Sequence, residues 1–311
     1  MVNIRVHNPC NEHTRYFRNY NYFWDKFTNY LKDYFNVEEN RYFENAHKER
    51  FPVKLNKGIS GDFLMLECEY VIENLDTGEF VVMSVSDELT HAILNEKSNP
   101  FLKKVIISQF LPKKILDHVG EHINKYSPWT YFQSCMDELS IYYDKRKTLE
   151  SFKNKLYFKG TSLEDRQIIH FINKDIITNF GVINPSSYFE DLITHKMALS
   201  VDGRGEFCYR DVECFGIGVP IIRFEYVSEF NVPLIPNYHY ISIPRPDDMG
   251  LYRLGNEHHA KLLEERYYEI INDDEFLKFV SKNAKQYYED NLSLEIKIKN
   301  TFNLLNLNDW L

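Results

Sequence analysis

A glycine pair and an arginine that could together hold a phosphate group lie between residues 196 and 223, in KMALSVDGRGEFCYRDVECFGIGVPIIR. Gly203 and Gly205 permit a tight turn after a strand-like run, and they let a ligand approach the backbone closely. Arg210 follows at the expected start of a helix, where its planar fork of donors suits a phosphate. Amides at a helix start also favour anionic oxygens. The stretch therefore predicts a phosphate site, although plain structural turns share this glycine pattern.

Hydrophobic periodicity predicts strands that alternate with helices, which is typical of a parallel α/β architecture. In the first half we expect a helix over 13–35 and strands over 2–8, 61–73, 78–88 and 103–110. In the second half we expect strands over 155–160, 195–203, 218–224 and 239–244, and helices over 162–172, from 209, and over 256–300 with a break at 272–274. The charged segment 140–155 is the expected boundary between two domains, 1–150 and 151–311.

Composition narrows the class of protein. The 311 residues carry a net charge of −9, without the basic stripe that a nucleic-acid binder normally shows, so we expect no nucleic-acid partner. The five cysteines are scattered and lack CxxC spacing, which disfavours a disulfide framework and indicates a reducing compartment. No run of about 18 apolar residues occurs, so we expect no transmembrane segment and a cytoplasmic location.

The order of several segments resembles one family. LYFKGTSLEDR, KMALSVDGRGEFCYR, GVPIIRF, PNYHYISIP and a helix containing NAKQYYEDNL follow one another between residues 156 and 292. This order is similar to the glycosyltransferase family of fungal capsule-associated xylosyltransferases and animal protein O-glucosyltransferases. The sequence departs from that family's pattern at Lys159, which replaces an arginine, at Cys208-Tyr209, which replace Ser-Phe, and at Ser242, which replaces a proline. Residues 1–75 carry no matching motif.

The resemblance implies a fold and a reaction. The fold is an α/β architecture of GT-B type, with two Rossmann-like domains facing a central cleft and closing C-terminal helices. The reaction is transfer of a sugar, glucose or xylose, from a UDP-sugar to a hydroxyl group of a glycan acceptor, with inversion. No cofactor and no divalent metal are implied, and the sequence has no Asp-x-Asp motif of the kind that clamps a metal–diphosphate.

The resemblance also assigns roles to residues. An inverting transfer needs one base for the acceptor hydroxyl, and positive charge or amide dipoles for the departing diphosphate. Asp87 occupies the position of the family's base, with Glu88 as its nearest rival and a turn-capping aspartate as the plain structural alternative. The expected donor-site residues are Arg210, Gly203, Gly205, Arg166, Gly160, Thr161, Tyr209, Glu213 and His239.

Several of these assignments are open to plainer interpretations. Glu213 is expected to hold the donor ribose by analogy with other two-domain transferases. For Arg166, a salt bridge on a helix surface is nearly as expected as a donor-site role. Lys159 could contact phosphate, but an exposed lysine is the commoner case, and His239 is more often a satisfied residue at a strand end. Trp129 could stack on a sugar face, although a buried tryptophan is the commoner case.

Two other functions remain open on the sequence. One is a retaining or exostosin-like transferase on the same fold. The other is a non-catalytic module that binds a nucleotide or a glycan. The sequence does not name the donor sugar, the acceptor or the linkage.

Overall fold

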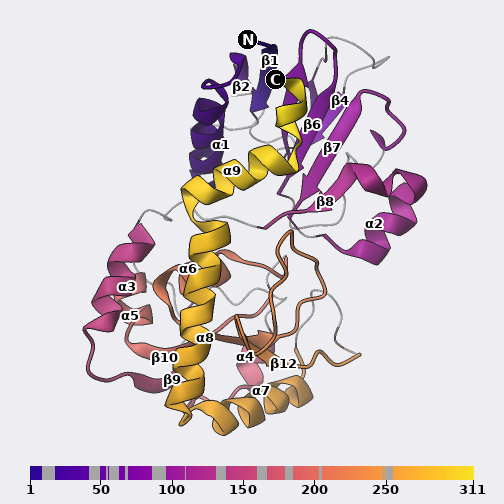
Figure 1. Cartoon of the computed structure of the whole chain (residues 1–311). Coiled ribbons are helices and arrows are strands. Elements are labelled where there is room, and N and C mark those ends of the chain that lie inside the picture. The colour runs from indigo at the N-terminus through magenta and orange to yellow at the C-terminus, as the bar shows by residue number, and fades with distance from the viewer. Residues whose placement is uncertain are drawn as a thin grey trace. The chain divides into compact units, whose positions relative to one another are not determined.

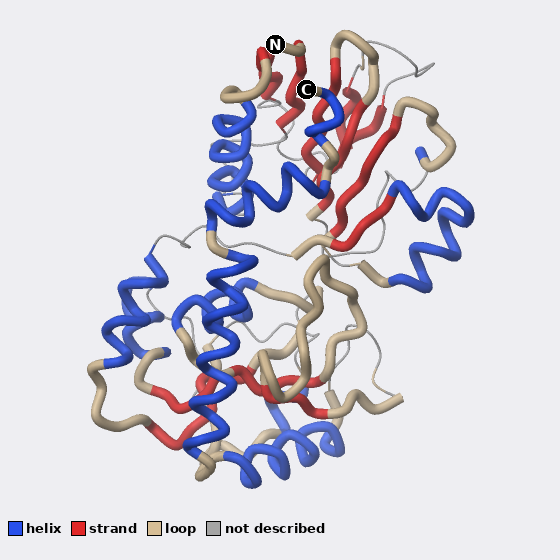
Figure 2. Tube along the Cα trace, viewed as in Figure 1, coloured by secondary structure: helices blue, strands red, loops and turns tan. Residues whose placement is uncertain are grey.

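A computed structural model describes most of the chain, which forms two compact units (Figures 1 and 2). The described residues are 1–8, 18–41, 50–53, 55, 63–66, 69–85, 96–108, 110–130, 138–159, 167–178, 185–202, 205–247, 249 and 255–311. The first unit comprises Met1–Ser134, Ser228–Asn231 and Leu294–Leu311, and the second comprises Cys135–Val227 and Val232–Ser293. The division into folding domains at residue 150 stays a prediction, because grouping by contacts does not measure independent folding.

The first unit is built on a mixed six-stranded sheet in the order β2-β1-β5-β6-β7-β8. Its strands are β1 (Asn3–Asn8), β2 (Asn36–Arg41), β5 (Glu69–Asn74), β6 (Phe80–Ser84), β7 (Leu102–Ile107) and β8 (Tyr126–Pro128). The pairs β1–β5 and β5–β6 are antiparallel and the other pairs are parallel. The turn after β5 explains the hairpin, because Gly78 adopts φ 82°, and its N–H bonds to the carbonyl of Asn74.

Aromatic side chains fill the core beside this sheet. Helix α1 (Arg18–Leu31) buries Trp24, which stacks at 4.8 Å on Tyr70 and at 6.3 Å on Trp129. Helix α9 (Leu294–Leu304) brings Lys297 over the Trp129 ring at 4.4 Å, where its ammonium group donates to Thr130. Burial lowers the pKa of Lys297 well below its ordinary value. Helix α2 (Pro112–Val119) also belongs to this unit, and β3 (Arg50–Val53) pairs with β4 (Phe63–Leu66) in a separate antiparallel ribbon.

The second unit is built on a parallel sheet in the order β12-β11-β10-β9. The strands are β9 (Lys153–Tyr157), β10 (His195–Leu199), β11 (Ile221–Phe224) and β12 (Ile241–Ile243). A further parallel bridge joins Leu156 of β9 to Ile177, on a segment that follows β9 in the chain. The bonds from Leu156 N to Ile176 O, 2.6 Å, and from Thr178 N to Leu156 O, 3.0 Å, form this bridge.

The strand order reverses between β9 and β10. After β9 the chain passes first through Ile177 on one side of β9, and it then returns to β10 on the other side. Open α/β sheets bind ligands at such a reversal, in the crevice beyond the carboxyl ends of the strands. The residues that follow β9 and β10 are therefore the first place to look for a site.

Helices cover both faces of the second sheet, as Figure 1 shows. Met197, Leu199 and Ile222 share one hydrophobic cluster with residues of α4 (Ile168–Phe171) and α7 (Glu257–Ile270). Ala198 and Arg223 alternate with them and so point to the other face, where α6 (Tyr209–Ile217) lies. The remaining helices are α3 (Leu139–Lys147), α5 (Pro185–Leu192) and α8 (Asp274–Tyr287).

Most predicted elements of the second unit are confirmed, including β10, β11, β12, the start of α6 at Tyr209 and the cap of α8. In that cap Asp273 accepts a hydrogen bond of 2.9 Å from the N–H of Phe276. The expected single strand over 61–73 was wrong, because the chain forms β4 and β5 in two different sheets. The expected boundary segment 140–155 contains α3, and helices α2 and α5 were not predicted. Within the described residues, no helix has the length and apolarity needed to cross a membrane.

Candidate functional site

Arg210 lies at the carboxyl edge of the second sheet, at the reversal point between β9 and β10. It is the second residue of α6, and its Nη2 donates to the carbonyl of Lys159, two residues beyond β9, at 2.5 Å. Its guanidinium also stacks on the ring of Phe158 at 4.3 Å. These two contacts fix the side chain while leaving it half-buried rather than enclosed. The predicted phosphate ligand thus sits at the place where this type of sheet binds ligands.

A carboxylate and a tyrosine accompany this arginine. Glu213, one turn further along α6, is almost fully buried and accepts a hydrogen bond of 2.9 Å from the hydroxyl of Tyr188 in α5. The hydroxyl of Tyr157 in turn donates to the carbonyl of Tyr188 at 3.1 Å. Burial and then the Glu213 carboxylate raise the pKa of Tyr188 well above its ordinary value, so this hydroxyl is a permanent donor at neutral pH.

The electrostatics of the arginine follow from the same neighbours. Burial lowers the pKa of Arg210, but Tyr188 and then Glu213 raise it, and the net shift is upward. The guanidinium is therefore always charged. A charged planar fork beside a buried carboxylate offers one group for phosphate oxygens and one for sugar hydroxyls.

A buried ionic network holds the turn that leads into α6. Arg223, within β11 and almost fully buried, bonds to Asp202 at 2.7 Å and to Asp211 at 3.2 Å. Arg245, just after β12, reaches the other oxygen of Asp202 at 2.9 Å and the carboxylate of Glu206 at 3.0 Å. These residues come from four consecutive segments of the chain, so the network connects the carboxyl ends of β10, β11 and β12 with the start of α6.

Helix α6 begins where this network ends. The Oδ2 atom of Asp211 accepts from the N–H of Cys208 at 2.6 Å, and its Oδ1 accepts from the hydroxyl of Ser200 at 2.5 Å. Because Asp211 is also paired with Arg223, the first turn of α6 is anchored to both β10 and β11. The position of Arg210 on that turn is therefore set by buried contacts rather than by its own flexible side chain.

Three carboxylates share two guanidiniums in this network, which leaves it short of positive charge. Burial raises the pKa of Asp202 to about 6, and Glu206 adds to the rise, although Arg223 and Arg245 oppose it. Asp211 competes with Asp202 for the same arginine. Asp202 is therefore the network's titrating group near neutral pH.

The other expected donor-site residues divide into three groups. Gly205 is buried in the bend before α6, where its carbonyl accepts from the Cys208 thiol at 3.4 Å, and Tyr209 is the half-buried first residue of the helix. His239 precedes β12 and so lies at the amino end of its strand, away from the carboxyl ends that Arg210 contacts. Its Nδ1 accepts from the N–H of Ile235 at 2.9 Å, which matches the plainer strand-end interpretation. Asp87, Glu88, Gly160, Thr161, Arg166 and Gly203 lie outside the described residues.

Trp129 is a buried core residue rather than an exposed one. Its indole is 0 % exposed, and its Nε1 donates to the hydroxyl of Thr301 at 3.1 Å. Phe23 and Trp24 contact its ring as well. Stacking on a sugar needs an open ring face, so this geometry does not support the expected sugar-stacking role, and the commoner alternative of a core tryptophan describes it.

Two residues of the site were missed by the sequence analysis. Tyr188 carried no signal, because its partner Glu213 is brought to it only by the tertiary fold. Arg223 did carry a signal that could have been used. A charged residue inside the apolar run GVPIIRF, in a strand covered on both faces, requires buried partners of opposite charge.

Comparisons with known proteins give distant structural likeness only. No protein-family model matches the sequence, and no curated protein is significantly similar to it. A glycosyltransferase from Rickettsia africae has a TM-score of 0.47 at 10 % identity, over 72 % of this chain and 69 % of that one. Sucrose-phosphate synthase from Thermosynechococcus elongatus has a TM-score of 0.42 at 14 % identity, over 70 % and 61 %. Anabaena HepE, solved in complex with UDP-glucose, has a TM-score of 0.40 at 10 % identity, over 71 % of each chain. Likeness at this level assigns neither a fold family nor an activity to this chain.

The titration of Asp202 predicts a pH dependence of stability. The folded-state pKa of about 6 lies above the ordinary aspartate value, so the folded protein holds this proton where the unfolded chain has lost it. Stability contributed by the proton is therefore lost as pH rises through 6. Relative to Asp202→Asn, the wild type is expected to lose about 1 kcal/mol of unfolding free energy between pH 5 and pH 7.

Urea denaturation of both proteins at the two pH values measures this difference. Mass spectrometry should confirm that the introduced side-chain amide has not deamidated beside Gly203. An identical change with pH in the two proteins would contradict the assignment of this titration to Asp202.

Proposed function

We propose that this chain is a glycosyltransferase that uses a nucleotide sugar, with UDP as the nucleotide, and transfers glucose or xylose to a hydroxyl group of a glycan. One observation carries the proposal. The guanidinium of Arg210, on the first turn of α6, is held at the carboxyl end of β9 by Lys159 and Phe158, beside the carboxylate of Glu213. A fixed cation at the reversal point of a parallel sheet is a place for a diphosphate.

The proposed architecture is of GT-B type, with Rossmann-like domains at 1–150 and 151–311 and helices that close the C-terminal end. The parallel sheet of the second unit, flanked by helices, supports the nucleotide-binding half of this arrangement. The segments that carry the family resemblance lie in the same unit, around β9, β10, β11 and β12.

Loss of the diphosphate is the step that Arg210 would assist. As the bond between the anomeric carbon and the β-phosphate oxygen breaks, negative charge grows on the departing UDP. A guanidinium that is already positioned stabilises that charge without reorganisation. The bend at Gly205 would let amide groups approach the same oxygens, and no divalent metal is proposed for this role.

Glu213 would bind the donor's ribose. A buried carboxylate accepts hydrogen bonds from hydroxyl groups, as this one already does from Tyr188. Because Glu213 follows Arg210 by three residues on the same helix, the two side chains project from neighbouring turns. In the proposal, the one side chain would contact the diphosphate and the other the ribose of the same nucleotide.

The acceptor hydroxyl must lose a proton as it attacks, and we propose Asp87 as the base, with Glu88 as the alternative. The acceptor oxygen would attack the anomeric carbon from the face opposite UDP, its proton would pass to the base and the bond to UDP would break, so this single displacement would invert the anomeric configuration. A cytoplasmic role in glycan assembly is part of the same proposal and rests on the cysteine pattern of the sequence.

Titration calorimetry with UDP, GDP and ADP, each with and without EDTA, tests the nucleotide site. We expect UDP to bind best, with the same affinity in EDTA, and Arg210→Ala to weaken UDP about 10- to 100-fold because one charge-assisted contact is lost. Arg210→Lys should recover only part of the affinity, since an ammonium group lacks the planar fork.

Arg266→Ala serves as the matched control, because Arg266 is in the same unit but lies on α7 and pairs there with Glu269. It should bind UDP as the wild type does. Binding of another nucleotide in preference to UDP, or equal losses in Arg210→Ala and Arg266→Ala, would contradict the proposed site.

Substitution of the base separates an enzyme from a binding module. In Asp87→Asn we expect turnover of UDP-glucose or UDP-xylose to fall about 10²- to 10⁴-fold, while the affinity for UDP stays unchanged. Glu88→Gln is the comparison, and the larger loss identifies the base. A wild-type protein that binds UDP but releases none from any donor and acceptor glycan would sink the enzyme and leave a nucleotide-binding module.

A further inference from the structure

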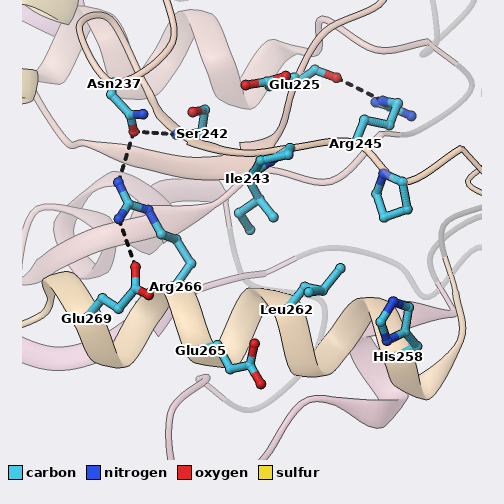
Figure 3. A pocket seen from close by; sticks show the side chains of 12 residues that line it. Glu225, Asn237, Ser242, Ile243, Arg245, His258, Leu262, Glu265, Arg266 and Glu269 are labelled. Carbon is cyan, nitrogen blue, oxygen red and sulfur yellow. Dashed lines mark hydrogen bonds and ion pairs between the residues drawn. The ribbon is translucent and has the colours of Figure 1, made fainter.

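A pocket of about 660 Å³ lies between β12, the edge strand of the second unit's sheet, and helix α7 (Figure 3). One side of α7 forms its wall, with His258, Leu262, Glu265, Arg266 and Glu269 spaced three or four residues apart. Its volume is within the range of small-molecule sites, which is roughly 300–1,000 Å³. The donor-site residues Arg210 and Glu213 do not line it.

We propose that this pocket binds a neutral sugar residue. Its charge argues against an anionic ligand, because Glu225, Glu265 and Glu269 outnumber Arg245 and Arg266 on its wall. Lys261, which does not line the pocket, lies 3.9 Å from Glu265 and is 73 % exposed, so water screens its charge. The charge of Arg245 is already compensated by two buried carboxylates of the network described above. A phosphate or a carboxylate would therefore meet excess negative charge.

The polar groups on the wall suit hydroxyl groups. Arg266 pairs with Glu269 at 2.9 Å, and the side chains are 26 % and 63 % exposed, so the pair presents donors and acceptors together to the pocket. Each hydroxyl of a sugar can both donate and accept a hydrogen bond. Two neighbouring hydroxyls could therefore bond to Arg266 and Glu269 at the same time. Glu265, 57 % exposed, adds acceptors and the hydroxyl of Ser242 adds both functions.

Apolar groups alternate with these polar ones. Ile243 and Leu262 project between the charged side chains in Figure 3, and Pro244 and Pro246 continue the wall beyond β12. A sugar ring carries C–H groups on its faces and hydroxyls at its rim. Apolar contact at the face with hydrogen bonds at the rim is the combination that this wall offers.

A peptide strand is the main rival for a pocket beside a sheet edge, and the backbone of β12 opposes it. The N–H of Ser242 is already bonded to Asn237 Oδ1 at 3.2 Å. Pro244 and Pro246 follow directly, and proline cannot donate to a ladder. Strand addition needs a row of open backbone groups, which this three-residue strand does not provide.

The inference that the pocket binds a sugar depends only on these residues. The identity of the molecule that carries the sugar depends on the proposed function. In a glycan-building transferase the bound residue would belong to the acceptor chain, held away from the reacting end. The pocket would then select acceptors by a sugar other than the one that reacts.

Saturation-transfer NMR with the full chain tests the pocket. The probes are the methyl glycosides of glucose, xylose, galactose and mannose and the disaccharides maltose and lactose, with glucosamine and glucose 6-phosphate as charged comparisons. We expect a neutral sugar to bind, and the double variant Glu265→Ala, Glu269→Ala to weaken it at least about tenfold, since bonds to charged groups are lost. Both glutamate side chains are more than half exposed, so the variant should fold normally.

Glu257→Ala is the matched control, because this exposed glutamate starts the same helix and does not line the pocket. It should bind the sugar as the wild type does. The inference is overturned if no neutral sugar binds, if glucosamine or glucose 6-phosphate binds better, or if the double variant binds equally well. UDP titration of the double variant keeps the two proposals separate. In the wild type, sugar binding without UDP binding would refute only the nucleotide site. UDP binding by the wild type without sugar binding would refute only the pocket.

Discussion

The buried pairing of Arg223 with Asp202 and Asp211 is the interaction on which the second unit's carboxyl edge depends. A guanidinium in a strand covered on both faces cannot remain without anionic partners, since an uncompensated buried charge costs several kcal/mol. One aspartate follows β10 and the other lies in the first turn of α6, so neutralising Arg223 also ties the start of α6 to the end of β10. Arg245 and Glu206 extend the same pairing to the end of β12. The location of any ligand beside α6 is thus set by electrostatics inside the fold.

Arg210, the proposed diphosphate ligand, lies outside this network. The carboxylates of Asp202, Asp211 and Glu206 are paired with Arg223 and Arg245, whereas Arg210 contacts the carbonyl of Lys159, the ring of Phe158 and the hydroxyl of Tyr188, beside Glu213. A carbonyl contact orients a guanidinium without cancelling its charge. Two arginines of this edge are therefore paired inside the network, and the third, Arg210, is the one that we propose for the ligand.

Arg245 belongs both to this network and to the wall of the α7 pocket. Its Nε donates to the carbonyl of Glu225 at 2.8 Å, which ties the pocket's rim to the segment after β11. One guanidinium thus joins the proposed sugar pocket to the turn beside the proposed nucleotide site. In the proposed function, the donor and the acceptor chain would bind to parts of the second unit that Arg245 connects.

The sequence predicted the parts of this fold that depend on local patterns. The turn before Tyr209, the strands of the second unit and the cap at Asp273 follow from glycine, β-branched and capping residues close together in the chain. Pairings between distant segments could not be predicted, because periodicity does not say which elements meet. Tyr188 and Glu213 are 25 residues apart and meet only through packing.

The same limit explains why the sequence left two residues open between a site role and a plainer structural one. Trp129 is enclosed because helix α9, from the end of the chain, returns to pack on it. His239 lies at the amino end of β12 because it precedes the strand by two residues, and its Nδ1 accepts from the N–H of Ile235 there. In the first unit, the tight turn at Gly78 joins β5 to β6. Strand character was predicted on both sides of this turn, but the antiparallel pairing of β5 with β6 was not.

A crystal structure of the protein with UDP bound would test the central claim most directly. The account predicts diphosphate oxygens within hydrogen-bond distance of the Arg210 guanidinium and of the first turn of α6, and ribose hydroxyls on the carboxylate of Glu213. UDP bound elsewhere, with Arg210 making no contact to it, would contradict the account.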